Sequence, residues 1–369
     1  MKHAGKIILG LMLVAVVIAI GVRLSTRQAP VAGGKPIIKI GVSAPLTGNV
    51  AFLGEGIRNA VTLAQERLPK DTKYQYELVL EDDEFEAKRQ ISAVNKLIDI
   101  DNVDAFLTVG SGAGNIAAPI AESKKTIHVG IASDPTIAKG EYNFIHWTPP
   151  AEEVKVLIPE LQKRNLKRVA VMGANIQGIT AVIDEFEKQI PGTDIQVVSK
   201  DIFTFGEKDF RSLIAKAKAT NPDVYLPIAF SPEIEILAKQ LEEAGIAQPI
   251  TTVEAFELTD QPQLFEGRWY VNAADMSEVF RADYKTRFGK EVSLAAGNAY
   301  DIVNLVVRAA ESIETNGTDR PTTEQIKNAL YDVKISDGAL GELGLNRDGL
   351  VVTKAVVRMI KDGKPMTVK

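Results

Sequence analysis

From Ile37 onward, short runs of apolar and β-branched residues alternate with longer stretches in which apolar residues recur every three or four positions. The short runs are typical of buried strands, and the longer ones of amphipathic helices. In the first part, the predicted helices span about 54–68, 85–98 and 115–123, and the predicted strands are YELVLE, DAFLTV and IHVGIAS after an initial IIKIGVS. Strands that alternate with helices form parallel sheets, so this part is predicted to be an α/β unit.

The same alternation starts again after NFIHWTPP. Helices are expected from about Glu152, Gly178, Phe210 and Pro232, and the predicted strands are RVAVMG, IQVVSKD, DVYLPI, PITTV and RWYVNAA. Two similar units in series indicate two similar lobes. The tail adds three helices and a hairpin that is predicted to turn at residues 346–349.

The N-terminus differs from the rest of the chain. Basic residues flank an uncharged apolar run at 7–22. Its length lies between that of the apolar region of a cleaved signal peptide and the roughly 20 residues that span a bilayer. Residues 1–28 are therefore predicted to be an export signal, either a cleaved signal peptide or a retained membrane anchor, rather than a core helix. Residues 29–36 are predicted to be a flexible linker, and the remaining chain is expected outside the cytoplasm.

Composition excludes several classes of protein. The 369 residues are 45% hydrophobic, enough for two buried cores. Acidic and basic residues are interspersed with a net charge of -5, so the basic stripe of a nucleic-acid-binding protein is missing. Cysteine is absent, which rules out thiol catalysis, disulfides, Cys-ligated zinc and the lipid-modified cysteine of a bacterial lipoprotein.

The sequence offers little for catalysis. Its histidines are His3, His128 and His146, and His128 lies inside a predicted strand, where a buried imidazole with satisfied hydrogen bonds is expected. Motifs of serine hydrolases, zinc proteases and EF-hands are missing. The acidic run at 80–85, LEDDEF, lies where a strand ends and a helix begins, so its acids are expected to cap that helix rather than bind a metal. We therefore predict no enzyme, no metal and no cofactor.

The stretch VGSGAGN (109–115) follows a predicted strand, at the edge where parallel sheets bind ligands. Its glycine spacing fits neither a dinucleotide fingerprint nor a phosphate loop. What remains is an amide-rich turn with one hydroxyl, that of Ser111, at the start of a helix. Such a turn favours an anion such as a carboxylate, although a purely structural tight turn has the same pattern.

Two further segments lie at comparable edges. Ser133 and the amides near Ile131 and Ala132 end the next strand, so two neighbouring loops can share one carboxylate. Glu254 follows PITTV in the second unit, where a carboxylate can take a charge-assisted hydrogen bond from a ligand ammonium. The structural alternatives are a capped turn at Ser133 and a solvated surface glutamate at position 254.

Six segments also carry a family likeness. In order, they resemble parts of the branched-chain amino acid type of ABC-transporter solute-binding protein, and the likeness runs from about Ile37 to the C-terminus: IKIGVSAPLTGNVAFLGEGIRNAVTLA, LEDDEFEAKRQISAVNKLI, VGSGAGNIAAPIAESKKTIHVGIASDP, GEKDFRSLIAKAKATNPDVYLPIAFSPEIEILAKQLEEAGI, AGNAYDIVNLVVRAAESI and GALGELGLNRDGLVVTKAVVRMIKDGKP. No single one is diagnostic, but their shared order makes chance improbable.

This resemblance implies a type I periplasmic-binding-protein fold. It has two α/β lobes, each a parallel sheet flanked by helices, joined by three crossovers at a hinge and here preceded by the N-terminal hydrophobic helix. The expected first lobe comprises 37–149 and 273–333, and the second 150–272 and 334–369. Proteins of this fold close on a ligand by rigid-body hinge motion.

The resemblance also implies roles for individual residues. The first-lobe loops hold the ligand α-carboxylate, and Glu254 holds its ammonium. Two positions near the ligand side chain depart from the family pattern, since Leu53 and Gln177 stand where relatives often have aromatic residues. Phe230 is expected to form one wall of the pocket for that side chain. The residues expected at the carboxylate are Ser111, Gly112, Ala113, Ile131, Ala132 and Ser133.

The expected function is that of an extracytoplasmic receptor of an ABC importer. It binds an aliphatic or small polar amino acid as a monomer and delivers it to membrane permease subunits. A sensor of the same fold, acting on an amide or small acid through a signalling partner, is the alternative. A hydrolase that uses the interlobe cleft is disfavoured because a nucleophile and base pair is missing.

Overall fold

The structure is a computed structural model that describes residues 34–48, 50–259, 261–316 and 319–368. Residues from Ile37 onward form one compact unit. The predicted signal or anchor at 1–28, and most of the predicted linker, lie outside the described residues. Within the described ranges, no helix has both the length and the apolar character needed to cross a membrane.

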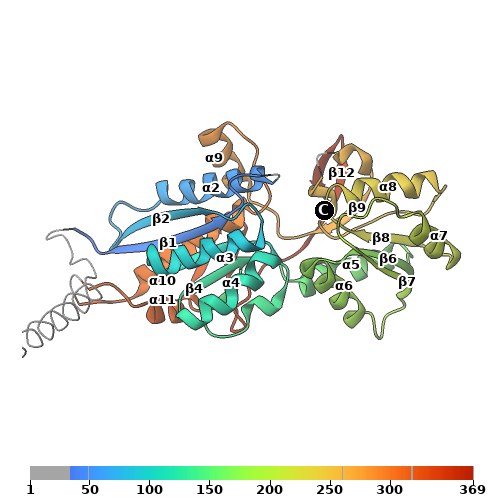
Figure 1. Ribbon diagram of the computed structural model, residues 1–369. Coiled ribbons are helices and arrows are strands. Elements are labelled where there is room, and N and C mark those ends of the chain that lie inside the picture. Colours follow the sequence, from blue (N-terminus) through green and yellow to red (C-terminus); the bar gives the residue numbers. More distant parts are fainter. Residues whose placement is uncertain (1–33, 49, 260, 317–318, 369) are drawn as a thin grey trace, which may run out of the picture. The chain divides into compact units, whose positions relative to one another are not determined.

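The first lobe is built on a five-stranded parallel sheet (Figure 1). Its strand order is β2-β1-β3-β4-β5, so β1 lies between β2 and β3, and Ile40 pairs with Leu78 on one side and Ala105 on the other. All carboxyl ends therefore lie at one edge. The strands are β1 (Ile37–Ala44), β2 (Gln75–Asp82), β3 (Ala105–Val109), β4 (Ile127–Ile131) and β5 (Asn143–Ile145).

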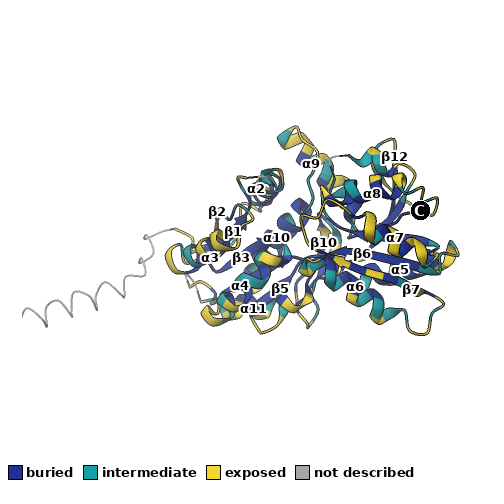
Figure 2. Cartoon of the chain, turned by 45° about the vertical axis from the view of Figure 1, so that its right-hand side comes forward, coloured by how far each residue is buried: buried dark blue, intermediate teal, exposed yellow. Residues whose placement is uncertain are grey.

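Helices cover both faces of this sheet. On β3, Leu107 packs into the large core with α2 and α10, and its neighbour Phe106 packs into a smaller cluster with α3 and α4. Strands covered on both faces are apolar throughout, and β3 and β4 are buried at every position (Figure 2). The helices of this lobe are α2 (Ala51–Glu66), α3 (Ala87–Asn95), α4 (Ser111–Lys124), α9 (Glu278–Phe288), α10 (Ala296–Ser312) and α11 (Thr323–Leu330).

The second lobe contains two three-stranded sheets. The parallel one has the order β7-β6-β8, and the antiparallel one the order β13-β12-β9. The predicted strand PITTV forms isolated bridges instead, in which Ile250 pairs with Tyr225 and Val253 with Val271, so the segment links the two sheets. The strands are β6 (Arg168–Ala174), β7 (Gln196–Phe203), β8 (Val224–Ile228), β9 (Trp269–Asn272), β12 (Val356–Lys361) and β13 (Lys364–Thr367).

Helices α5 and α6 pack together in this lobe, as do α7 and α8. Their apolar faces and the strands form a second core, separate from the first. Each helix begins within two residues of its predicted start, because a strand and a short loop precede it. The helices are α5 (Pro150–Lys163), α6 (Gln177–Gln189), α7 (Arg211–Ala219) and α8 (Glu233–Glu243).

The chain passes between the two cores three times. It leaves the first core after Trp147, returns between Val271 and Ala273, and leaves again between Val351 and Ala355. The last crossing differs from the sequence prediction, which put all of 334–369 in the second lobe. Residues up to Val351 pack with the first lobe instead.

The hairpin of β10 (Lys334–Gly338) and β11 (Gly341–Gly344) explains this difference. The buried carboxylate of Asp301 in α10 accepts hydrogen bonds from the N–H groups of Ala339 (2.6 Å) and Leu340 (2.9 Å), which fixes the hairpin on the first core. The predicted turn at 346–349 is present, with Leu345 bridging Val351. It does not extend into one long hairpin, because the chain then crosses to the second lobe, where β12 pairs with β9 and β13.

Candidate functional site

The loop between β3 and α4 requires a glycine at position 110. Gly110 has a φ of 89°, and a Cβ there would lie 3.1 Å from ring atoms of Phe85. The helix begins at Ser111 rather than near residue 115 as predicted. Ser111, Gly112 and Ala113 therefore form the first helical turn, whose N–H groups have no acceptor within the helix and carry the positive end of its dipole.

The neighbouring loop after β4 is joined to this turn. The Gly110 N–H donates to the carbonyl of Ile131 (2.9 Å), and the Asp134 N–H donates to the Ser111 hydroxyl oxygen (3.2 Å). Ala132 is buried and Ser133 is half-buried between these contacts. The two loops are thus adjacent, as the sequence predicted, and their binding of a carboxylate stays a prediction.

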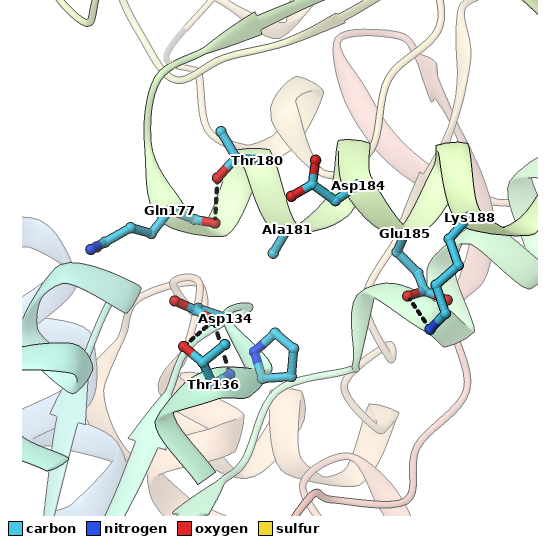
Figure 3. Close-up of a pocket in the computed structure, with 9 residues that line it drawn as sticks. Asp134, Thr136, Gln177, Thr180, Ala181, Asp184, Glu185 and Lys188 are labelled. Carbon is cyan, nitrogen blue, oxygen red and sulfur yellow. Dashed lines mark hydrogen bonds and ion pairs between the residues drawn. The ribbon is translucent and has the colours of Figure 1, made fainter. Parts of the chain in front are cut away.

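The start of α6 approaches this turn from the second lobe. A Cβ added to Gly178 would lie 3.0 Å from the Ser111 hydroxyl oxygen and 3.4 Å from the Ser133 Cβ. Gln177, the first residue of α6, is exposed and lines a cavity of about 340 Å³ between this helix and the loop after β4 (Figure 3). The other residues that line it are Asp134, Pro135, Thr136, Thr180, Ala181, Asp184, Glu185 and Lys188.

Glu254 follows the bridge at Val253 and has a φ of 62°, an unfavourable value for a residue with a Cβ. Its N–H donates to the Val271 carbonyl (2.8 Å), which holds this conformation. Its carboxylate accepts a 2.7 Å hydrogen bond from the indole N–H of Trp147, a buried residue of the first core. Glu254 is therefore oriented by a side chain of the other lobe.

A second carboxyl group lies beside Glu254. Glu153, in the first turn of α5, is fully buried, and neither of its carboxyl oxygens has a hydrogen-bond partner among the described residues. Burial raises the pKa of Glu153 well above its usual value, and the neighbouring Glu254 raises it further. Burial also raises the pKa of Glu254, whereas the neighbouring Glu153 carboxyl group and the hydrogen bond from Trp147 act in the opposite direction.

Trp147 and Glu153 are site residues that the sequence analysis missed. Trp147 is one of only two tryptophans, which is a weak signal, and the first turn of a helix is an ordinary place for an acid such as Glu153. No spacing in the sequence relates either residue to Glu254. Only the folded chain brings the three together.

The residues that are predicted to surround the ligand side chain also follow the carboxyl ends of strands. Leu53 is half-buried in the first turn of α2, which follows β1, and Phe230 lies two residues after the end of β8 and packs partly against the second core. Phe52, beside Leu53, is 63% exposed. The roles of Leu53, Phe230 and Gln177 as walls of a ligand pocket stay predictions.

Hydrogen bonds show the roles of His128 and of the acidic run at 80–85. His128 is fully buried and contacts Thr108 through Nε2 (2.8 Å) and Asn143 through Nδ1 (2.9 Å), which confirms the satisfied imidazole. Asp82 accepts the Leu46 N–H (2.9 Å), so this acid of LEDDEF organises the loop after β1 instead of capping α3 as predicted. Within the part of the chain that the structure describes, no His, Cys, Asp and Glu cluster suits a metal ion.

Comparison with known proteins identifies the family. The sequence model of the family described as periplasmic binding protein matches residues 37–364, and the chain belongs to this family. Its relatives are solute-binding proteins, a class without catalytic activity. The chain is 26% identical over 333 residues to Leu/Ile/Val-binding protein homolog 3 of Brucella melitensis, covering 85% of this chain and 88% of the relative.

Solved structures share the fold. A leucine binding protein from Thermotoga maritima has a TM-score of 0.80 and 24% identity, covering 90% of this chain and 98% of that one. A solute-binding protein of an ABC transporter from Rhodopseudomonas palustris, in complex with 3,4-dihydroxybenzoic acid, has a TM-score of 0.78 and 19% identity, covering 90% and 96%. The predicted α/β fold of type I periplasmic binding proteins is thereby confirmed.

Proposed function

We propose that this protein is the extracytoplasmic receptor of an ABC importer and binds an amino acid between its lobes. The observation that carries the proposal is that Glu254, a half-buried acid of the second lobe, is oriented by Trp147 of the first lobe, the lobe in which α4 begins at Ser111. An acid on one lobe and a helix N-terminus on the other suit the ammonium and the carboxylate of one zwitterion.

In the proposed binding mode, each lobe holds one charged group of the ligand. The N–H groups of Ser111, Gly112 and Ala113, with those of the Ile131–Ser133 loop, receive the ligand carboxylate, and Glu254 receives the ammonium. Because one ligand then contacts both lobes, it stabilises the closed arrangement more than the open one. The closed receptor is the form that permease subunits recognise, and the monomer is sufficient for this task.

The ligand side chain is proposed to be aliphatic or small and polar. Leu53 and Phe230 offer apolar surface, and Gln177 offers an amide at the start of α6. The Brucella melitensis relative is named for leucine, isoleucine and valine, which supports an aliphatic ligand. The aromatic acid bound to the Rhodopseudomonas palustris protein has no ammonium group, so it needs no counterpart of Glu254.

The test is a thermal-shift screen of residues 34–369 against the twenty amino acids, small amides and benzoic acids. A ligand that binds only the folded state raises the melting temperature. We expect stabilisation by a group of related amino acids, retained in Glu152→Gln and lost in Glu254→Ala. Stabilisation by amides or simple acids alone, unaffected by Glu254→Ala, would reject the amino acid and favour the alternative of a sensor for such compounds.

A further inference from the structure

Glu153 is the one member of the site whose role the proposed function does not use. Its side chain is fully buried, and both carboxyl oxygens lack a donor among the described residues. An ionised carboxylate accepts hydrogen bonds only. A buried charge without a hydrogen-bond donor is strongly unfavourable, which favours the protonated form of the carboxyl group.

Among the described residues, neither Glu153 nor Glu254 forms an ion pair with a cation. Glu257 is the next acid beside Glu254, and its charge is compensated by Arg358 of β12 at 2.7 and 2.8 Å. Tyr270 of β9 also donates to Glu257. The side-chain amide of Gln189 in α6 donates to the Ala151 carbonyl and not to Glu153.

A protonated Glu153 has a partner within reach. Its neighbour Glu254 already accepts one hydrogen bond from Trp147 and keeps lone pairs free on its carboxylate. Two ionised carboxylates side by side repel each other, whereas an acid and a carboxylate share a proton in a short, strong hydrogen bond. Burial of the pair strengthens that preference.

We propose that Glu153 is a neutral carboxylic acid that donates its proton to Glu254 and so acts as a positioning residue for the ligand ammonium. The positioning role rests on the proposed function, whereas the protonated state of Glu153 does not depend on it. Together with Trp147, Glu153 then holds the Glu254 carboxylate from two sides. The pair carries a single negative charge, which matches a ligand with one ammonium at this end.

Two variants separate a neutral acid from an ionised one. Glu153→Gln keeps the shape and a donor, so we expect the affinity for L-valine, or for the amino acid that the screen selects, to stay within about threefold of wild type. Glu153→Leu removes the donor, and we expect the affinity to fall about tenfold to a hundredfold. Glu152→Gln, at a half-buried neighbour on the same helical turn whose carboxylate pairs with Lys155, is the matched control.

The proton itself is tested without any ligand. We expect the infrared spectrum of the ligand-free protein at pH 7 to contain the C=O stretch of a protonated carboxyl group that disappears in Glu153→Gln and persists in Glu152→Gln. Subtracting the variant spectra removes the contribution of Asp301, another buried acid with a raised pKa. An unchanged band in Glu153→Gln would reject the neutral acid and leave the proposed function intact.

Two outcomes of the affinity measurements would contradict the inference. A loss of affinity in Glu153→Gln as large as in Glu153→Leu would overturn the inference, because it would mean that the charge of Glu153 contributes directly to ligand binding. Equal affinity in both variants would also overturn it, since Glu153 would then have no positioning role. Failure of the wild type to bind any amino acid contradicts the proposed function, whereas the infrared comparison still decides the state of Glu153.

Discussion

Trp147 donates its indole N–H to the carboxylate of Glu254 across 2.7 Å, although the two residues are 107 positions apart in the chain. Trp147 is packed in the first core, whereas Glu254 belongs to a loop of the second lobe. The contact lies beside the first crossover, so it couples the orientation of an acid to the placement of both lobes.

Replacing this indole tests that coupling. In Trp147→Phe the ring packing is largely kept, but Glu254 loses a donor. A hydrogen bond to a charged group contributes about 1.5–3 kcal/mol, so we expect a loss of about ten- to a hundredfold in amino acid affinity, measured by titration calorimetry. The control is Trp269→Phe. Trp269 is the other tryptophan and stacks with Arg164. This variant should keep wild-type affinity. Equal affinity in both variants would show that the indole N–H is dispensable.

The loop before α4 is predicted to tolerate no side chain at its first glycine. Gly110→Ala places a Cβ against Phe85 at a positive φ, so we expect the free energy of unfolding to fall by roughly 2 kcal/mol or more. Gly112→Ala lies two residues further, where a Cβ meets no atom within 4 Å, and alanine favours a helix by up to about 1 kcal/mol. Urea unfolding of both variants is the measurement. Similar losses in the two would contradict this account of the turn.

Burial raises the pKa of Asp301 to about 7 in the folded protein. Between about pH 4 and 7 the folded state then binds more protons at this position than the unfolded state, so this carboxyl lowers stability as pH rises through that window. Asp301→Asn cannot titrate, and we expect its stability relative to wild type to increase from pH 4.5 to pH 7.5 in urea unfolding. Glu342→Gln, exposed on the same hairpin, should show no such trend. A flat difference for Asp301→Asn would disprove the raised pKa.

His128 is predicted to act in the opposite direction. Burial lowers its pKa to about 4, whereas the unfolded chain takes up the proton near its ordinary value of 6.5. The contribution of His128 to stability is therefore lost as pH falls from about 6.5 to 4. Relative to His128→Gln, the wild type should lose stability over this range and not above pH 7. Persistence of the same loss in His128→Gln would assign it to other groups, such as His146.

The fold follows from the sequence because its signals are local. Apolar runs mark β3 and β4 as strands buried on both faces, and the spacing of apolar positions marks their helices. The lobe boundary near residue 352 is different, because it depends on Asp301 receiving the hairpin amides of Ala339 and Leu340. A contact between residues nearly forty positions apart has no periodic signature.

The site shows the same division. Ser111 and Ser133 could be predicted together because each follows a strand, and adjacent parallel strands end at one edge. Trp147 and Glu153 could not be predicted, since their relation to Glu254 arises from the crossover between lobes. The start of α4 was placed too late because glycines at its first turn reduce helix propensity, although free N–H groups there are what an anion needs.

The most direct test of the central claim is a binding comparison of three compounds: L-valine or the amino acid that the screen selects, its α-hydroxy acid, which lacks the ammonium, and its amide, which lacks the carboxylate. For the wild type, calorimetry should give at least about a hundredfold weaker binding for each analogue, as expected when a charge-assisted contact is lost. In Glu254→Gln the preference for the amino acid over the hydroxy acid should largely disappear, while the preference over the amide remains. If Glu254→Gln keeps the full preference for the amino acid, Glu254 does not hold the ammonium and the proposed site is wrong.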